Sequence, residues 1–136
     1  GLLLGAKQTG FPGRILGISV DKPADELTQT IMALANQTAA WLGIDKKIES
    51  ADVLVNDAYC QAGYGILQPA EVEAIRLFAR TEGILLDPVY TGRAAAGLID
   101  LIRKGFFSPN ETVLFWHTGG IPALFAEPYA SALLGS

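Results

Sequence analysis

The chain has 136 residues, half of them hydrophobic, and a formal net charge of −4 from ten basic and fourteen acidic side chains. Few and scattered basic residues exclude nucleic-acid binding, because phosphate recognition needs clustered lysine and arginine, and no apolar run reaches the roughly 18 residues of a membrane span. The single cysteine, Cys60, cannot form an internal disulfide, which favours a reducing compartment and hence the cytoplasm.

The first half of the chain predicts a helix, a strand and a second helix. Residues 1–7 read as a short helix that ends at a glycine. Residues 14–20 are apolar and partly β-branched, as expected of a strand buried on both faces. The second helix starts near Pro23, repeats apolar side chains every three or four residues and stops at Gly43. Because Gly1 opens directly into an apolar run, we expect a piece of a larger fold.

The middle of the chain continues the alternation. Residues 51–55 form a predicted strand, and an irregular stretch follows over residues 56–65. A third helix is predicted from Pro69 to Gly83, because proline suits a first helical turn and glycine a helix end. A short apolar segment over residues 84–86 closes this part.

The last third predicts a helix over residues 92–104, the clearest strand over residues 112–117, and a short helical piece over residues 121–126. Apolar strands that alternate with helices are typical of the α/β class, with a parallel sheet covered by helices on both faces. Without a repeat or linker, residues 1–136 are predicted to form a single α/β unit. The mean hydropathy of +0.31 indicates that part of its surface faces another domain or subunit.

Three turns are candidates for a ligand site, because ligands of open α/β sheets bind beyond the carboxyl ends of the strands. They are residues 57–65, residues 87–92 and residues 117–120. Each combines hydroxyl or phenol groups with glycines, which allow a ligand to approach the backbone. Taken alone, each turn is weak evidence.

Several polar residues of these turns have simpler interpretations. The only histidine, His117, is more often a hydrogen-bonded structural residue at such a strand end, and no nucleophile-elbow motif accompanies it. Cys60 has no CxxC or histidine partner, so a packing role is favoured and no metal site is predicted. The aspartates lie at element ends, where aspartate commonly caps or turns.

The combination of motifs is more specific than any of them alone. It consists of Gly63-Tyr64-Gly65, the run EGILLDPVYTGR over residues 82–93, and the run FWHTGGIPALF over residues 115–125. In order and spacing, these motifs resemble the D-cysteine desulfhydrase and 1-aminocyclopropane-1-carboxylate (ACC) deaminase family of pyridoxal-phosphate-dependent enzymes. The resemblance covers essentially the whole chain.

The resemblance implies a two-domain, fold type II enzyme related to the tryptophan synthase β subunit, of which this chain is the C-terminal portion. The family's cofactor-bonding lysine and a substrate-contacting serine-asparagine pair belong to an N-terminal half absent from this sequence. No lysine here matches the family position, so the chain alone is expected to be inactive. The resemblance also implies a small amino-acid substrate and a homodimer.

The resemblance assigns roles to six residues. Tyr64 and Tyr90 match the two tyrosines that face the substrate, and they are the predicted catalytic residues. They would orient the substrate and handle protons near its leaving group. The predicted cofactor-binding residues are Thr91, Thr118, Gly119 and His117, with one of the two threonines near the pyridine nitrogen.

The residue after Tyr90 separates activities within the family. ACC deaminases resemble one another in having glutamate there, where this chain has Thr91. A hydroxyl offers the ring nitrogen a hydrogen bond but no charge. The resemblance therefore favours a D-cysteine desulfhydrase, which forms pyruvate, sulfide and ammonia by α,β-elimination. ACC deaminase and L-cysteate lyase remain alternatives, as does a non-catalytic α/β module that holds an anion at Gly119-Gly120 and the helix after Thr91.

Overall fold

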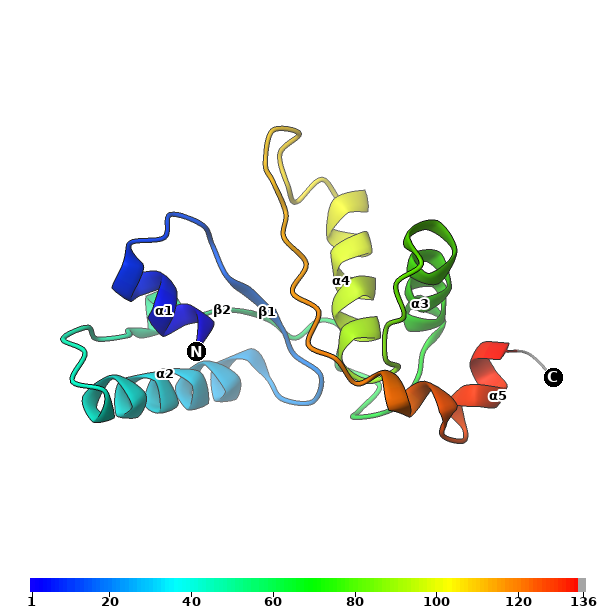
Figure 1. Ribbon diagram of the computed structural model, residues 1–136, viewed down its shortest axis with the longest axis horizontal. Helices are drawn as coiled ribbons and strands as arrows, with labels where there is room; N and C mark the ends of the chain where they lie inside the picture. Colours follow the sequence, from blue (N-terminus) through cyan, green and yellow to red (C-terminus); the bar gives the residue numbers. More distant parts are fainter. Residues whose placement is uncertain (135–136) are drawn as a thin grey trace. The chain divides into compact units, whose positions relative to one another are not determined.

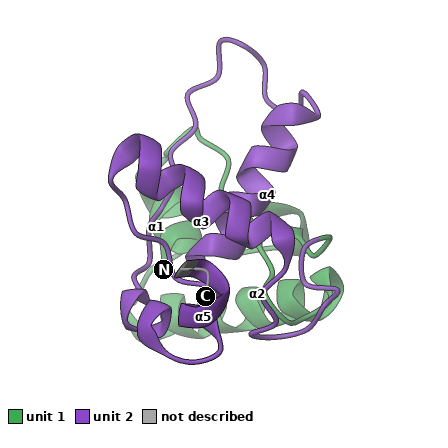
Figure 2. Ribbon diagram, turned by 90° about the vertical axis from the view of Figure 1, so that its right-hand side faces the viewer, with its two compact units in different colours: residues 1–58 green, residues 59–136 purple. Residues whose placement is uncertain are grey.

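The computed structural model describes residues 1–134, and their contacts group into two compact units, Gly1–Ala58 and Tyr59–Ser136 (Figure 2). The sequence leads us to expect one unit, whereas these contacts cluster separately. Each unit is described by itself. Figure 1 shows the order of the elements along the chain.

The first unit holds the α/β part of the fold. Its elements are helix α1 (Leu2–Thr9), strand β1 (Leu16–Ile18), helix α2 (Ala24–Trp41), the 3-10 turn η1 (Ser50–Asp52) and strand β2 (Leu54–Asn56). The two strands pair in parallel, with Leu16 opposite Leu54 and Ile18 opposite Asn56. This confirms the α/β class with a parallel sheet, which has two strands in the part of the chain that the structure describes.

A small apolar core holds this unit together. Its buried members come from both helices and from the segment before β2, and they are Leu4, Ala35, Ala39, Ile48 and Val53. Asn36 fixes the segment after α2, because its side chain donates to the carbonyl of Ile48 (2.9 Å) and accepts from the Ile48 N–H (2.8 Å). At the other end of α2, the Asp57 carboxylate accepts the N–H of Ala24 (2.8 Å). Asp57 therefore caps a helix, as expected of an aspartate at an element end.

The second unit contains the candidate site turns. Its elements are α3 (Pro69–Glu82), α4 (Thr91–Arg103), the 3-10 turn η2 (Ile121–Phe125) and α5 (Tyr129–Leu134). Helices α3 and α4 pack on each other through small and branched side chains, and Ala74, Ile75, Leu86, Ala95 and Ala96 form the buried core. Small residues on α4 allow its backbone to approach α3 closely. At Gly92, an added Cβ would lie 2.5 Å from the Asp87 carbonyl oxygen and 3.0 Å from the Ile75 side chain.

The predicted helices are confirmed within a residue or two of their observed ends. Helix α3 begins at Pro69 behind a capping box, in which the Glu71 carboxylate accepts the N–H of Gln68 (3.1 Å). It ends at Glu82, and the capping residue that follows, Gly83, has a left-handed φ of 67°, which suits glycine. These caps are local features, which explains why sequence alone locates them.

The strand predictions hold less well. Residues 14–20 contain a three-residue strand that is half-buried rather than buried on both faces. In the predicted strand 51–55, the first two residues belong to η1 instead, because the Asp52 carboxylate accepts the N–H of Glu49 (2.8 Å) and closes a turn. Strand β2 consequently starts at Leu54.

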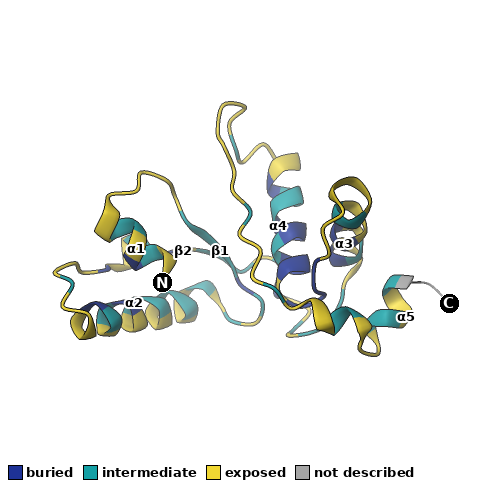
Figure 3. Ribbon diagram, in the orientation of Figure 1, coloured by how far each residue is buried: buried dark blue, intermediate teal, exposed yellow. Residues whose placement is uncertain are grey.

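The strand predicted over residues 112–117 is wrong in this structure, which assigns no strand there. Its apolar side chains are largely exposed, with Leu114 at 79% and Trp116 at 59% of their full accessibility (Figure 3). Strand propensity expresses packing against neighbouring strands. Within residues 1–134, only β1 and β2 form a sheet, so this segment has no neighbouring strand to pair with.

Candidate active site

The two predicted catalytic tyrosines lie together in the second unit. Tyr64 belongs to the irregular loop before α3, and Tyr90 immediately precedes α4. Their hydroxyl groups are hydrogen-bonded to each other, and their rings meet edge to face with centroids 5.9 Å apart. Both side chains remain accessible, at 55% and 45% exposure. The pair therefore presents two phenol hydroxyls at one place on the surface of this unit.

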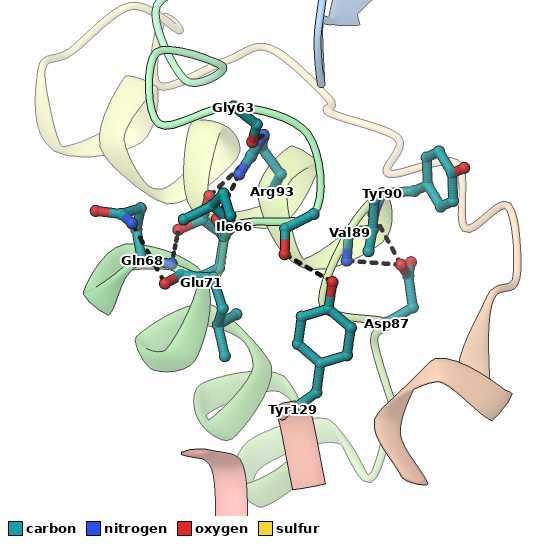
Figure 4. Close-up of polar contacts among 11 residues, drawn as sticks. Gly63, Ile66, Gln68, Glu71, Asp87, Val89, Tyr90, Arg93 and Tyr129 are labelled. Atoms are coloured by element: carbon teal, nitrogen blue, oxygen red, sulfur yellow. Dashed lines mark hydrogen bonds and ion pairs between the residues drawn. The ribbon is translucent and has the colours of Figure 1, made fainter. Parts of the chain in front are cut away.

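Asp87 builds the turn that places Tyr90. One carboxylate oxygen accepts the N–H groups of Val89 and Tyr90, both at 2.8 Å (Figure 4). The other oxygen accepts the N–H of Thr91 at 2.6 Å. Burial raises the pKa of Asp87, but these hydrogen bonds and that of the Thr91 hydroxyl outweigh burial and lower the pKa below its usual value. The carboxylate is fully buried and acts as the N-terminal cap of α4.

Thr91 faces this cap rather than the surface. Its side chain is buried, its hydroxyl donates to Asp87 Oδ1 (2.7 Å), and Thr91 Oγ1 in turn accepts the Asp87 N–H (2.8 Å). The N–H groups of Thr91 and Gly92 are also bonded to Asp87. The start of α4 is thus occupied by the chain's own carboxylate, which argues against the alternative in which this helix end holds an anion.

The third turn combines a fixed imidazole with two glycines. His117 Nδ1 accepts the N–H of Gly119 (3.0 Å), so its Nε2 carries the proton and donates to the carbonyl of Leu85 (2.9 Å). Both ring nitrogens therefore serve the backbone, in agreement with the structural interpretation of this residue. Thr118, between the two bonded residues, is exposed.

Gly120 joins the third turn to the cap of α4. Its φ of 90° is left-handed, and a Cβ added there would lie 2.7 Å from Asp87 Cγ. Since Asp87 also accepts the N–H of Tyr90, the glycine turn and the backbone of Tyr90 border the same buried carboxylate. Two of the three predicted turns, and Tyr64 from the first, thus meet in one unit.

A buried ion pair beside the tyrosines was not predicted. Arg93 Nε donates to Glu71 Oε1 at 2.8 Å, and the two side chains are only 0% and 4% exposed. The guanidinium also donates to the carbonyls of Gly63 (3.0 Å) and Ile66 (2.8 Å), on both sides of Tyr64 (Figure 4). One feature of the sequence could have indicated this ion pair. Arg93 stands among small residues at the start of α4, and a buried arginine in such a run needs a negatively charged partner.

Acidification is expected to weaken the cap of α4. Because the folded-state pKa of Asp87 is lowered, its stabilising contribution is complete above the unfolded value of about 3.9 and is lost as the pH falls below it. Asp87→Asn should therefore reduce the free energy of unfolding at neutral pH by about 1–2 kcal/mol, with a smaller difference from wild type near pH 3. Urea unfolding at both pH values measures this, and a pH-independent difference would contradict it.

Comparison with known protein families shows to which family the chain belongs. A model described as "Pyridoxal-phosphate dependent enzyme" matches residues 1–119. The chain belongs to this family. Pyridoxal phosphate, the cofactor expected from the motifs, is thereby confirmed as the family's cofactor.

Similar proteins narrow the family. The chain is 38% identical over 126 residues to a 1-aminocyclopropane-1-carboxylate deaminase of Burkholderia vietnamiensis, and 37% identical over 130 residues to one of Methylobacterium sp.. It spans 93% and 96% of its own length in these matches, but only 37% and 39% of the relatives' length. A crystal structure of an ACC deaminase homologue matches with a TM-score of 0.80 and 35% identity, covering 98% of this chain and 38% of that one. The fold type II resemblance is confirmed at this level.

The second unit contains the kinds of groups that could contact pyridoxal phosphate. The surface of the second unit offers phenol hydroxyls at Tyr64 and Tyr90, an exposed hydroxyl at Thr118, and glycine backbone at residues 119 and 120. Hydroxyl donors beside glycines suit the edge of an aromatic ring that needs hydrogen bonds and close backbone approach. Among residues 1–134, no three His, Cys, Asp or Glu side chains are grouped to hold a metal ion, and no helix is long and apolar enough to cross a membrane.

Proposed function

We propose that the whole protein is a pyridoxal-phosphate-dependent lyase that acts on a small amino acid with a β-leaving group, with D-cysteine as the preferred substrate. The observation that carries the choice is Thr91. This residue stands where ACC deaminases resemble one another in having glutamate, and its hydroxyl is bound to Asp87. Since the chain spans less than two fifths of its relatives' length, the activity is proposed for the whole protein.

The tyrosine pair supports a proton-handling role. The two phenol oxygens share a hydrogen bond. When one phenol gives its proton to the substrate, the other phenol can replace that proton through this bond. Both rings are partly exposed, which leaves the hydroxyl groups accessible to a substrate. We assign Tyr64 and Tyr90 to orienting the substrate and to protonating the departing group.

A neutral ring partner favours elimination over ring opening. Asp87 is the carboxylate that opens the turn with Tyr90, and it is fully buried with both oxygens engaged by Val89, Tyr90 and Thr91. With Thr91 turned to this carboxylate, the exposed hydroxyl of Thr118 is our candidate for the hydrogen bond to the ring nitrogen. A hydroxyl cannot keep that nitrogen charged. Elimination needs a weaker electron acceptor in the cofactor ring than ring opening does, because the departing sulfur takes the electron pair.

The proposed reaction converts D-cysteine and water into pyruvate, hydrogen sulfide and ammonia. When bound, the cofactor would supply an electron sink for the substrate's α-carbon. The α-proton passes to a base, by resemblance the lysine in the rest of the protein, and the bond between Cβ and sulfur breaks with its electron pair on sulfur. A proton from the tyrosine pair converts the departing hydrosulfide into hydrogen sulfide. The remaining enamine gains a proton at Cβ, and water then displaces its nitrogen as ammonia to leave pyruvate. The lysine that bonds the cofactor belongs, by resemblance, to the rest of the protein.

Other aspects of the whole protein are proposed with it. We assign residues 1–136 to the cofactor-domain portion of a two-domain enzyme, because its family relatives are more than twice as long. We also propose a cytoplasmic homodimer: the single cysteine, Cys60, favours a reducing compartment, and the dimer is implied by the family resemblance alone.

ACC deaminase is the second candidate, and the names of the similar proteins favour it. The relatives from Burkholderia vietnamiensis, Methylobacterium sp. and Pseudomonas syringae all carry that name at 37–38% identity. L-cysteate lyase is a third activity of the same chemical class, with sulfite as the leaving group.

Parallel assays of the whole protein separate these activities. Ammonia and keto-acid release should be measured with D-cysteine, L-cysteate and ACC at equal concentrations. We expect kcat/KM for D-cysteine to exceed the others by at least about tenfold, since a site that bonds the correct substrate discriminates by that order or more. Release from ACC without release from D-cysteine would establish the second candidate. No turnover of any substrate, with no cofactor absorbance, would favour a non-catalytic module.

A further inference from the structure

The loop that carries Tyr64 is held by its backbone. Three carbonyls around Tyr64 accept hydrogen bonds from side chains elsewhere in the unit. Arg93 holds the carbonyls of Gly63 (3.0 Å) and Ile66 (2.8 Å), and the Tyr129 hydroxyl holds that of Gly65 (2.6 Å). Figure 4 shows the two donors reaching this loop from α4 and α5.

The loop needs such support because of its composition. Tyr64 stands between two glycines with left-handed backbones, at φ values of 101° for Gly63 and 72° for Gly65. Glycine has many accessible conformations, so little in the local backbone restricts this turn. The Tyr64 side chain is 55% exposed, so side-chain packing restrains it only in part. Hydrogen bonds from outside the loop therefore help to fix the backbone from which the Tyr64 phenol reaches Tyr90.

The first donor, Arg93, is held in place by a buried ion pair. Arg93 is fully buried, and its charge is balanced by Glu71, which also accepts the N–H of Gln68 in the capping box of α3. A guanidinium presents its donors in a fixed planar fork. Arg93 can therefore hold two carbonyls at a set spacing while it remains tied to α3.

The second donor is independent of this ion pair. Tyr129 lies at the start of α5, far along the chain from the loop, and its half-buried ring places the hydroxyl against the Gly65 carbonyl. The fit is close, because a Cβ added at Gly65 would lie 3.0 Å from the Tyr129 oxygen. The hydroxyl thus acts on the backbone next to Tyr64 rather than on the tyrosine pair.

We propose that Tyr129 and Arg93 are positioning residues, which fix the glycine-flanked turn so that the Tyr64 hydroxyl meets that of Tyr90. The positional claim stands on the hydrogen bonds above, and its consequence for turnover rests on the proposed function. Loss of one backbone bond lets the turn move, and a misplacement near 1 Å costs on the order of 100-fold in rate. Tyr129→Phe, which keeps the ring, should lower kcat of the whole protein roughly 10- to 100-fold with KM changed far less.

The direct test is spectroscopic and does not need activity. Tyrosine labelled with carbon-13 at the ring carbon that bears oxygen reports the hydrogen bonding of each phenol. In the whole protein, Tyr64→Phe removes the partner of Tyr90 and should shift the Tyr90 signal. Tyr129→Phe should shift the same signal in the same direction, although Tyr129 bonds to the loop backbone. Tyr59→Phe is the matched control, since its hydroxyl is bonded to Asp100 (2.7 Å), and it should leave the Tyr90 signal in place.

Arg93→Lys supplies a second, independent variant. Lysine keeps the positive charge beside Glu71 but cannot reproduce the planar fork that spans two carbonyls. We expect the Tyr90 signal to shift as in Tyr129→Phe. If both variants leave that signal at its wild-type position while Tyr64→Phe moves it, the positioning role is wrong. If the signals shift as expected but Tyr64→Phe turns over normally, the positioning role stands and the catalytic role of the pair is wrong.

Discussion

Replacing Arg93 by methionine is expected to reduce the free energy of unfolding by about 3–5 kcal/mol, because the change leaves Glu71 as a buried carboxylate without its counter-ion. The two side chains are 0% and 4% exposed. The substitution also removes the donor that satisfies the carbonyls of Gly63 and Ile66. Denaturant unfolding of wild type and variant, followed by circular dichroism, measures the difference.

The same pair of helices supplies a matched control. Arg103 on α4 pairs with Glu73 on α3 at 2.5 Å, but these side chains are 59% and 51% exposed. Exposed ion pairs contribute little because water screens them. Arg103→Met should therefore leave the unfolding midpoint almost unchanged. The double variant Glu71→Leu with Arg93→Met should recover part of the lost stability, and equal losses in the Arg93 and Arg103 variants would contradict the account.

Replacing Tyr90 by phenylalanine should lower kcat of the whole protein by about 100-fold or more, the usual effect of losing a positioned proton donor. The ring and its edge-to-face contact with Tyr64 can be kept, because only the hydroxyl is removed. Binding of the cofactor should change far less than kcat. Steady-state assays with D-cysteine and titration with pyridoxal phosphate measure the two effects separately.

Tyr59→Phe is the control for this loss of a hydroxyl. Burial, with the hydrogen bond and negative charge of Asp100, raises the pKa of Tyr59 to about 12, so this phenol stays protonated at neutral pH. Its hydroxyl is bonded to the last turns of α4, away from the start of that helix at Thr91. We expect turnover close to wild type. Normal turnover in Tyr90→Phe as well would remove Tyr90 from the mechanism.

The helices could be predicted from the sequence because their ends are encoded locally. Pro69 and the capping box behind it mark the start of α3, and Gly83 marks its end. The strand expected over residues 112–117 shows the limit of such reasoning. Apolar β-branched and aromatic residues favour a strand, but a strand forms only when a neighbouring strand pairs with it. In residues 1–134 the only sheet consists of β1 and β2, so this segment has no strand partner.

The sequence predicts that Tyr64 and Tyr90 lie together, but it does not predict the contacts that hold them in place. The family motifs place Tyr64 and Tyr90 together, and the structure brings their hydroxyls into contact. The direction of a threonine cannot be read from a motif, and the burial of Thr91 against Asp87 is therefore a structural finding. The link from Arg93 to Glu71 joins residues 22 positions apart in the sequence. Helical spacing within one element cannot reveal such a contact.

The position of Asp87 has a consequence for any redesign of the turns around it. Both oxygens of its carboxylate accept N–H groups at the start of α4, and Gly120 lies so close that an added Cβ would be 2.7 Å from Asp87 Cγ. The start of α4 and the turn at Gly120 therefore both depend on the position of Asp87. A substitution that moves one of them is expected to move the other. Libraries that vary substrate preference should leave positions 87 and 120 untouched and diversify the outward-facing neighbours instead.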